Sequence, residues 1–405
     1  MQKIYFDHSA TTPLDPEVFE AMKPYLTSEF GNASSLHIFG QKARAGAEKA
    51  REQVANFLGS EPKEIIFTSG ATESNNLAIL GLARRLRALD PNRKLHLITS
   101  SIEHPAVLEP CRELEKEGIR ITYLPVTKGG LVKVESVEKA LRPETFLVSI
   151  MYVNNEIGTI QPIREIARVI KKARKVRCGK TYACFPGAPL YFHTDAAQAL
   201  NFCDCRVNWL EVDLLSLSAH KIYGPKGAGA LYVKGGTPLW PLVYGGHQER
   251  ELRSGTENVA GIVGLGKAVE SLNQKSKIKT QNLRIKKLRD KLMEEVLKKI
   301  SGTIVNGDLR QRIPSNANFC FKKVEGESIL LMLDMEGIAV STGSACSSGS
   351  LEPSHVLTAM GVSPIVSHGN LRVTLGKNNS EEDVARFLEV LPGIVRRLRK
   401  MSPIK

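Results

Sequence analysis

The chain has 405 residues, of which 42% are apolar and 24% are charged, and its formal net charge is +14. This composition excludes a disordered, a collagen-like and a disulfide-stapled chain, and the length predicts two or three domains, or one large domain with an appendage. No apolar run approaches the roughly 18 residues of a membrane span and no signal-peptide core follows the N-terminus, so we expect a soluble, cytoplasmic protein that binds no membrane.

The basic excess lies in two stretches. Arg168 to Lys180 carries seven basic residues and no acid, and Ser271 to Ile300 carries ten basic and three acidic residues. The second stretch has the apolar stripe of an amphipathic helix, formed by Ile285, Leu288, Leu292 and Val296. Solvated helix faces are favoured over a nucleic-acid site, because no aromatic residues are interleaved for base stacking. A non-catalytic basic protein that binds a partner or nucleic acid stays open as an alternative function.

From Lys63 onward, short apolar runs alternate with longer helical patterns. Residues 64–70, 94–100, 145–153, 189–194 and 212–218 contain the predicted strands. This alternation predicts an α/β fold with a mostly parallel central sheet covered by helices on both faces. Because ligands bind at the carboxyl ends of such strands, the chemistry is expected in the loops SGATES, SIEH, VNNEIG, HTDAAQ and SAHK.

The pattern changes after Gly266. Five segments follow in this order: a long basic helix, the run NANFCFKKV, a helix at Gly326 to Met335, the stretch STGSACSSGS and a last amphipathic helix from Glu381. The sequence therefore predicts a large domain over residues 16–266 and a smaller α+β C-terminal domain over residues 267–405, which the N-terminal segment 1–15 joins.

Three features at predicted strand ends have chemical meaning together. The segment from Thr68 through Ala71 to Thr72 opens a helix whose amides face an anion such as phosphate, although a helix cap by Ser69 or Thr72 is the simpler interpretation of that motif alone. Asp195 and Lys221 each follow an apolar strand. A phosphate cradle, a carboxylate and an amine suit pyridoxal 5'-phosphate, whose phosphate, pyridine nitrogen and aldehyde would each obtain a partner.

Ten strings from Ile4 to about Ser402 carry a family resemblance. They are DHSATTPLDP, FGNASS, FTSGATESNN, EHPAVL, VNNEIGTIQPI, HTDAAQA, SLSAHKIYGPKGAGALYV, RSGTEN, STGSACSS and LEPSHVL. In residue identity, order and spacing, these motifs closely resemble those of the cysteine desulfurases that supply sulfur for iron–sulfur cluster assembly. The resemblance implies fold type I of the pyridoxal-phosphate-dependent transferases and a homodimer with two sites at the subunit interface.

The resemblance also implies roles for individual residues. Lys221 would carry the cofactor, His104 would stack on its ring, and Asp195 would pair with the pyridine nitrogen. The remaining cofactor contacts would come from Ala71, Thr72, Asn155, Gln198, Ser218 and His220, and from Thr256 of the other subunit. Asn32 and Arg372 would hold the substrate carboxylate, which the guanidinium fork can bind bidentately. Ala33 stands where the family usually has proline, which loosens this turn but leaves Asn32 in place.

The seven cysteines differ in expected role. Cys346 lies among small polar residues and matches the family's nucleophile, whereas Cys111 and Cys320 are expected to be buried apolar side chains. The remaining four are Cys178, Cys184, Cys203 and Cys205. Their spacing is not that of a zinc ribbon, so unpaired loop cysteines are favoured over a metal site, and no metal is predicted.

The activity that the resemblance implies is cysteine desulfurization. L-Cysteine would give L-alanine and a persulfide on Cys346, for transfer to an iron–sulfur scaffold protein or another acceptor, such as one for tRNA thiolation. Selenocysteine lyase and cysteine sulfinate desulfinase share this fold and cofactor and remain alternatives. The tail at Met401 to Lys405 is shorter than in members whose tail reaches a scaffold, so scaffold docking is left open.

Overall fold

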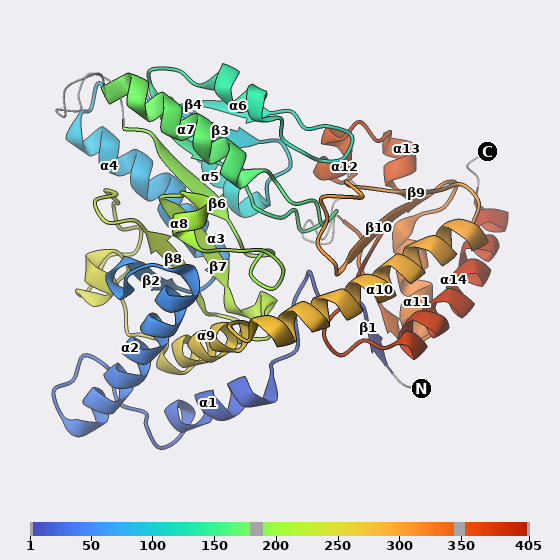
Figure 1. The fold of residues 1–405 in the computed structure, drawn as a ribbon, viewed down its shortest axis with the longest axis horizontal. Coiled ribbons are helices and arrows are strands. Elements are labelled where there is room, and N and C mark those ends of the chain that lie inside the picture. The colour runs from blue at the N-terminus through green and yellow to red at the C-terminus, as the bar shows by residue number, and fades with distance from the viewer. Residues whose placement is uncertain (1–2, 179–188, 344–352, 403–405) are drawn as a thin grey trace.

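The computed structural model describes residues 3–178, 189–343 and 353–402. Their fold has a large body around a seven-stranded sheet and a smaller body at the other end of the molecule (Figure 1). No helix in these three ranges is both long enough and apolar enough to cross a bilayer.

The seven-stranded sheet forms the centre of the large body. In sheet order its strands are β2 (Ile65–Thr68), β8 (Gly229–Val233), β7 (Leu214–Ser218), β6 (Tyr191–Asp195), β5 (Thr145–Ser149), β3 (His96–Ser100) and β4 (Arg120–Leu124). The five strands from β7 to β4 pair in parallel, and β8 is antiparallel to both of its neighbours. The predicted mostly parallel sheet is therefore confirmed.

Alternate residues of these strands face two different cores, as the pleat requires. Ile65 and Phe67 pack in the core beneath α2 (Ile38–Leu58), α7 (Ile163–Cys178) and α9 (Val259–Leu272), whereas Ile66 packs on the opposite face. That opposite face is covered by α3 (Ala71–Asn76), η2 (Leu77–Gly81), α4 (Leu82–Leu89) and α5 (Pro105–Lys116). Helices thus cover both faces of the sheet, as predicted.

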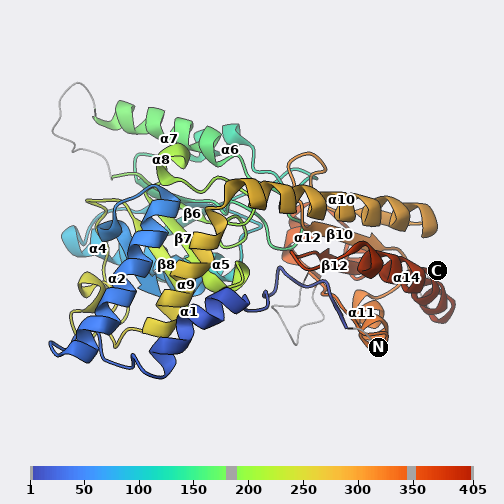
Figure 2. The ribbon, with the colours of Figure 1, turned by 60° about the horizontal axis from the view of Figure 1, so that its bottom comes forward.

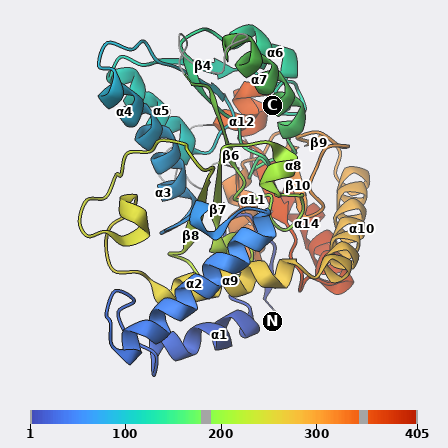
Figure 3. The ribbon, with the colours of Figure 1, turned by 60° about the vertical axis from the view of Figure 1, so that its left-hand side comes forward.

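Within the described residues, the large body contains six further short or peripheral helical segments. They are α1 (Pro16–Leu26), η1 (Pro62–Glu64), α6 (Val134–Ala140), α8 (Val207–Leu210), η3 (Ala219–Lys221) and η4 (Gln248–Glu251). Of these, η3 directly follows the central strand β7. Helices α1, α2 and α9 lie side by side at one edge of the molecule (Figures 2 and 3).

The smaller body contains two short sheets and a layer of helices. One sheet pairs β1 (Ile4–Tyr5) with β11 (Ile338–Ala339). The other contains, in sheet order, β12 (Asn370–Thr374), β10 (Asn316–Phe321) and β9 (Thr303–Val305). Its helices are α10 (Lys275–Lys299), α11 (Gly326–Met335), α12 (His355–Ala359), α13 (Pro364–Ser367) and α14 (Glu381–Met401). The helices predicted at Gly326 to Met335 and from Glu381 are confirmed.

The N-terminal segment belongs to the core of the smaller body. Phe6 is fully buried there, and its ring meets the Phe387 ring edge to face at 5.9 Å. The stripe of α10 is buried as predicted, because Ile285, Leu288, Leu292 and Val296 are at most 4% exposed. The domain boundary at residue 266 stays a prediction, since α9 continues to Leu272 with Ala268 and Val269 in the large core.

Candidate active site

Two adjacent parallel strands bring the predicted carboxylate and amine to the same edge of the sheet. Asp195 is the last residue of β6, Ser218 is the last of β7, and Lys221 ends the short helix η3 that follows β7 directly. The carboxyl ends of parallel neighbours lie together, so the predicted position of Asp195 and Lys221 at the ends of strands is confirmed.

The Asp195 carboxylate is buried and held on both oxygens. Oδ2 accepts a hydrogen bond of 2.7 Å from Asn75 Nδ2, and Oδ1 accepts one of 2.9 Å from the amide of Ala197. Asn75 lies on α3, and its own Oδ1 is buried without a hydrogen-bond partner among the described residues. Asp195 is thereby fixed in one orientation at the sheet edge.

The N-terminal segment packs against the Lys221 amine. Lys221 Nζ donates to the carbonyls of Ser9 and Ala10, at 2.5 and 2.7 Å. Gln198 Nε2 donates to the same Ser9 carbonyl at 2.9 Å. The ring of His220, the residue before Lys221, meets Thr11 Oγ1 at 3.2 Å. The segment that joins the smaller body thus also lines the site.

His104 lies at the N-terminal end of α5. Its Nδ1 accepts a hydrogen bond of 3.0 Å from the amide of Ala106, so the neutral ring carries its proton on Nε2. Burial lowers the pKa of His104, and Lys221 lowers it further, whereas Asp195 raises it. These three side chains therefore lie within electrostatic reach of one another, and the imidazole is neutral near neutral pH.

The turn between β2 and α3 leaves the first amides of the helix uncapped. The N-cap residue is Gly70, and no described side chain caps this end, so the interpretation in which Ser69 or Thr72 caps the helix is wrong. A Cβ on Gly229 would lie 2.5 Å from Gly70 Cα, so this approach of the two backbones requires glycine at position 229. The amides of Ala71 and Thr72, with the Ser218 hydroxyl nearby, form a cradle for an anion.

Arg372 is buried at the side of the site that faces the smaller body. Its Nη2 donates to Asp7 Oδ1 at 2.8 Å and its Nη1 to the carbonyl of Asn155 at 3.2 Å. Its Nε is buried without a hydrogen-bond partner among the described residues. A guanidinium whose Nε–H has no hydrogen-bond acceptor among the described residues suits a carboxylate ligand.

Two of the predicted site residues, Asn32 and Thr256, lie in exposed turns of the single chain and not at the ends of β6 and β7. Asn32 is exposed in the turn between α1 and α2, where its Oδ1 accepts from the Ser34 amide at 2.9 Å, and Thr256 is exposed after η4. Ala33 and Glu257, the residues that follow Asn32 and Thr256, line one cavity of about 630 Å³. The roles of Asn32 and Thr256 stay predictions.

Cys346 and Cys184 lie outside the described residues, as does the side chain of Cys178.

Several residues of the site received no role from the sequence. They are Asp7, Ser9, Asn75, Glu103 and Glu156. All five stand inside motifs that the family resemblance singled out, which is the only signal that pointed to them. Glu103 is fully buried next to His104, and burial raises the pKa of its carboxyl to about 8 even though Ser100 and the Met151 amide donate to it.

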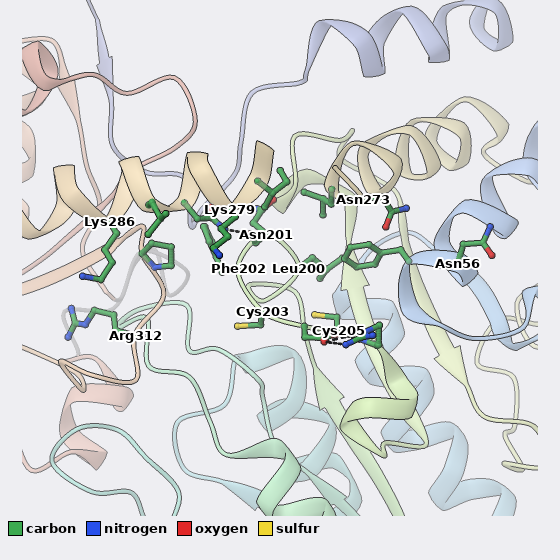
Figure 4. A pocket seen from close by; sticks show the side chains of 18 residues that line it. Asn56, Leu200, Asn201, Phe202, Cys203, Cys205, Asn273, Lys279, Lys286 and Arg312 are labelled. Carbon is green, nitrogen blue, oxygen red and sulfur yellow. Dashed lines mark hydrogen bonds and ion pairs between the residues drawn. The ribbon is translucent and has the colours of Figure 1, made fainter. Parts of the chain in front are cut away.

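A second cavity, of about 560 Å³, lies beside the loop from Leu200 to Arg206 (Figure 4). Cys203 and Cys205 line it, and burial raises the pKa of the Cys203 thiol to about 12. Within the described ranges, no three metal-ligating side chains gather in one place. Cys111 and Cys320 are fully buried, as predicted.

Comparison with known proteins matches this geometry to one family. The model of the family "Aminotransferase class-V" matches residues 4–387. A "Cysteine desulfurase IscS" of Dictyoglomus turgidum is 51% identical over 100% of this chain and 97% of its own length, and one of Methanosarcina thermophila is 50% identical over 99% and 94%. The chain belongs to the class V aminotransferases, among the cysteine desulfurases.

Solved structures agree with this assignment. A "NIFS-LIKE PROTEIN" superposes with a TM-score of 0.87 at 38% identity, covering 98% of this chain and 100% of its own. A structure titled "SspA in complex with cysteine" has a TM-score of 0.78 at 39% identity and covers 94% of this chain and 100% of its own.

Class V aminotransferases depend on pyridoxal 5'-phosphate, and the described residues of this cysteine desulfurase fit that group. The uncapped turn at Gly70 can receive the phosphate, the buried Asp195 carboxylate can pair with the pyridine nitrogen, and the Lys221 amine can bind the aldehyde. All three lie at one edge of the sheet.

Proposed function

We propose that this chain removes the sulfur atom from L-cysteine, releases L-alanine and retains the sulfur as a persulfide on Cys346. The observation that carries the proposal is the placement of the Lys221 amine and the Asp195 carboxylate at the ends of adjacent strands, beside an uncapped helix turn. The full-length similarity to proteins named cysteine desulfurase supports the choice of substrate.

The chain's own residues would hold the cofactor at three points. Ala71, Thr72, Ser218 and His220 would bind the phosphate, with Thr256 of the second subunit. His104 would cover the ring, and Asn155 and Gln198 would lie near its hydroxyl. When bound, pyridoxal 5'-phosphate withdraws electrons from the substrate and weakens its carbon–sulfur bond. Asp195, held by Asn75, supports this chemistry by keeping a negative charge where the protonated pyridine nitrogen needs it.

Substrate binding and proton movement would use other groups. The guanidinium of Arg372, together with Asn32, would bind the substrate carboxylate, and the unpartnered Nε of Arg372 supports this role. The Lys221 amine would take the proton from the substrate Cα. His104 would assist proton transfer, because its neutral imidazole can accept a proton near neutral pH.

Sulfur transfer would end on Cys346. Its thiolate would attack the substrate sulfur, so that a sulfur–sulfur bond forms while the bond from carbon to sulfur breaks. The electron pair of the broken bond stays with the substrate carbon, which takes up a proton and leaves in alanine. The persulfide would then pass to an iron–sulfur scaffold protein or to another sulfur acceptor.

Exposed apolar side chains support a homodimer. Phe30, Leu36, Ile38 and Phe39 lie close together in sequence around the turn that carries Asn32, and each is at least 47% exposed. The rings of Phe30 and Phe39 stack at 5.5 Å. An apolar patch of this kind marks an interface, which would also bring Asn32 and Thr256 to a partner's site.

The described cysteines form no disulfide, which supports a location in the reducing cytoplasm.

The test is to measure alanine and sulfide release from L-cysteine by the purified, cofactor-loaded protein and by Cys346→Ala, with a thiol reductant present to release the persulfide sulfur as sulfide. We expect the variant to keep the cofactor absorbance and to lose both products, because the acceptor of the sulfur is gone. Equal turnover by the variant would remove Cys346 from the reaction. Faster release from selenocysteine or cysteine sulfinate than from cysteine would favour selenocysteine lyase or cysteine sulfinate desulfinase instead.

A further inference from the structure

Strand β2 lies at the edge of the seven-stranded sheet, and two of its backbone groups bond to side chains. The Ile65 carbonyl accepts a hydrogen bond of 2.8 Å from Arg51 Nη1, and the Phe67 amide donates one of 2.8 Å to Glu249 Oε2. Arg51 and Glu249 also form a buried ion pair, with two contacts of 2.7 and 2.8 Å. Glu249 therefore fixes the strand that leads into the turn at Gly70.

The helical run that follows this turn is held by the same part of the chain. Helices α3, η2 and α4 follow one another without a break over residues 71–89. In the first turn of this run, Glu73 Oε2 accepts from the Ser69 amide at 2.8 Å, and Glu73 Oε1 accepts from Arg253 Nε at 3.0 Å. Residues 249–253, the clamp segment, thus contact the chain on both sides of the turn.

The clamp segment has a strained backbone. Glu249, Arg250 and Glu251 have φ values of 42°, 57° and 65°, in the left-handed region that residues with a Cβ rarely adopt. Just outside the segment, the Gly255 amide donates to Gln248 Oε1 at 3.0 Å and closes the loop. Such strain persists only where the surroundings hold it, and it clusters at functional sites. The strain therefore makes the clamp segment a candidate for a functional role.

Arg253 also offsets a charge that would oppose an anion. The Glu73 carboxylate lies in the first turn of the helix, close in the chain to the amides of Ala71 and Thr72 that form the cradle. Burial raises the pKa of Glu73, but hydrogen bonds from Ser69 and Arg253 outweigh burial, so the pKa lies below its ordinary value and the group is charged at neutral pH. An unpaired carboxylate here would repel a phosphate, and the ion pair with Arg253 reduces this repulsion.

We propose that Glu249 and Arg253 are positioning residues, which hold the turn between β2 and α3 in the conformation that receives the phosphate of pyridoxal 5'-phosphate. Glu249 acts through the Phe67 amide, and Arg253 acts through Glu73. The inference rests on the phosphate site of the proposed function and does not depend on where the sulfur goes. A turn that is held in its binding conformation takes up its anion without a cost for ordering the backbone.

The test is to titrate the full-length protein, freed of its cofactor, with pyridoxal 5'-phosphate and separately with pyridoxal, which has the same ring and aldehyde but no phosphate. The absorbance of the bound group gives both dissociation constants. The variants are Arg253→Ala, the conservative Arg253→Lys, and Glu249→Ala. The matched control is Arg84→Ala on α4, which breaks an ion pair of 3.1 Å with Glu117. Urea unfolding shows whether each variant is folded.

We expect Arg253→Ala and Glu249→Ala to raise the Kd for pyridoxal 5'-phosphate about tenfold or more and to leave that for pyridoxal within about twofold, because only the phosphate meets the turn. Arg253→Lys should stay within about threefold of the wild type, because its amine can still pair with Glu73. Arg84→Ala should change neither constant. In a Glu73→Gln background, Arg253→Ala should raise the Kd by less than about twofold, because the carboxylate through which Arg253 acts is gone.

A wild-type affinity for pyridoxal 5'-phosphate in either folded alanine variant would overturn the proposal. An equal loss of affinity for pyridoxal would also overturn it, as would an undiminished effect of Arg253→Ala in the Glu73→Gln background. If Glu249→Ala fails to fold, Arg253→Ala decides alone. The proposed function fails by a different result, which is full turnover of Cys346→Ala. Cofactor affinity is measured without turnover, so the two failures are distinguishable.

Discussion

Asn75 donates a hydrogen bond of 2.7 Å to the carboxylate of Asp195, although 120 positions separate the two residues in the sequence. This bond, with the one from the Ala197 amide, sets the direction in which the carboxylate faces the cofactor site. Under the proposed function, Asn75 would therefore act on the cofactor through Asp195.

We expect Asn75→Ala to lower kcat by about tenfold, because a misoriented carboxylate stabilises the protonated pyridine nitrogen less well. The cofactor absorbance band should shift in the variant, and this spectrum together with steady-state kinetics is the measurement. Asn76→Ala, at the next position of the same helix, is the control. A variant with wild-type kcat and an unshifted spectrum would show that the Asn75 bond is structural only.

Lys221 is expected to hold the cofactor covalently. Borohydride reduction of the loaded protein should fix the cofactor on the peptide that contains Lys221. Lys221→Ala should lose both this label and the turnover, because the Lys221 amine is the one that follows β7 directly. Peptide mass spectrometry gives the result, with Lys226→Ala, an exposed neighbour, as the control. Label on any other lysine would refute the assignment.

Arg372→Lys tests the binding of the substrate carboxylate. Lysine keeps the positive charge opposite Asp7 but lacks the planar fork of donors, so KM for cysteine should rise by about tenfold with a smaller change in kcat. Steady-state kinetics with the cofactor saturating checks this. A fall in kcat at constant KM would place Arg372 in a later step and not in substrate binding.

The residues that the sequence located correctly share one property. Asp195 and Lys221 follow apolar strands directly, so their place at the sheet edge depends only on local pattern and on the geometry of parallel sheets. The antiparallel direction of β8 did not follow from that pattern, because β2 and β8 meet only through pairing of segments far apart in the chain.

The partners of these residues could not be predicted for the same reason. The Ser9 carbonyl meets the Lys221 amine across 212 positions, and backbone carbonyls leave no mark in a sequence. The cap of α3 was assigned wrongly because Ser69 and Thr72 have the usual capping side chains, whereas Gly70 takes the position through a backbone approach that side-chain preference does not encode. The motif strings pointed to Asn75 only as part of a family pattern.

The last prediction concerns stability at acid pH and uses His193. This residue is fully buried in β6, with its ring nitrogens 2.8 Å from Ser149 Oγ and 3.0 Å from Ser216 Oγ, and burial lowers its pKa from 6.5 to about 3. Below pH 6.5 the unfolded chain binds a proton at this ring that the folded chain does not bind. The free energy of unfolding should therefore fall as the pH falls from 6.5 towards 3, by about 1.4 kcal/mol per pH unit for this group.

His193→Gln removes the titrating ring and should flatten this part of the stability curve, although a lower stability at neutral pH is expected from the changed packing. Urea unfolding at several pH values between about 7 and about 4 measures the slope for the wild type, for this variant and for His247→Gln, a control at an exposed position. Burial also lowers the pKa values of His8 and His220, to about 4. These two residues therefore contribute to the pH dependence of unfolding in the wild type and in both variants. An equal slope in His193→Gln and in the wild type would contradict the prediction, because it would mean that the buried ring does not release its proton on folding.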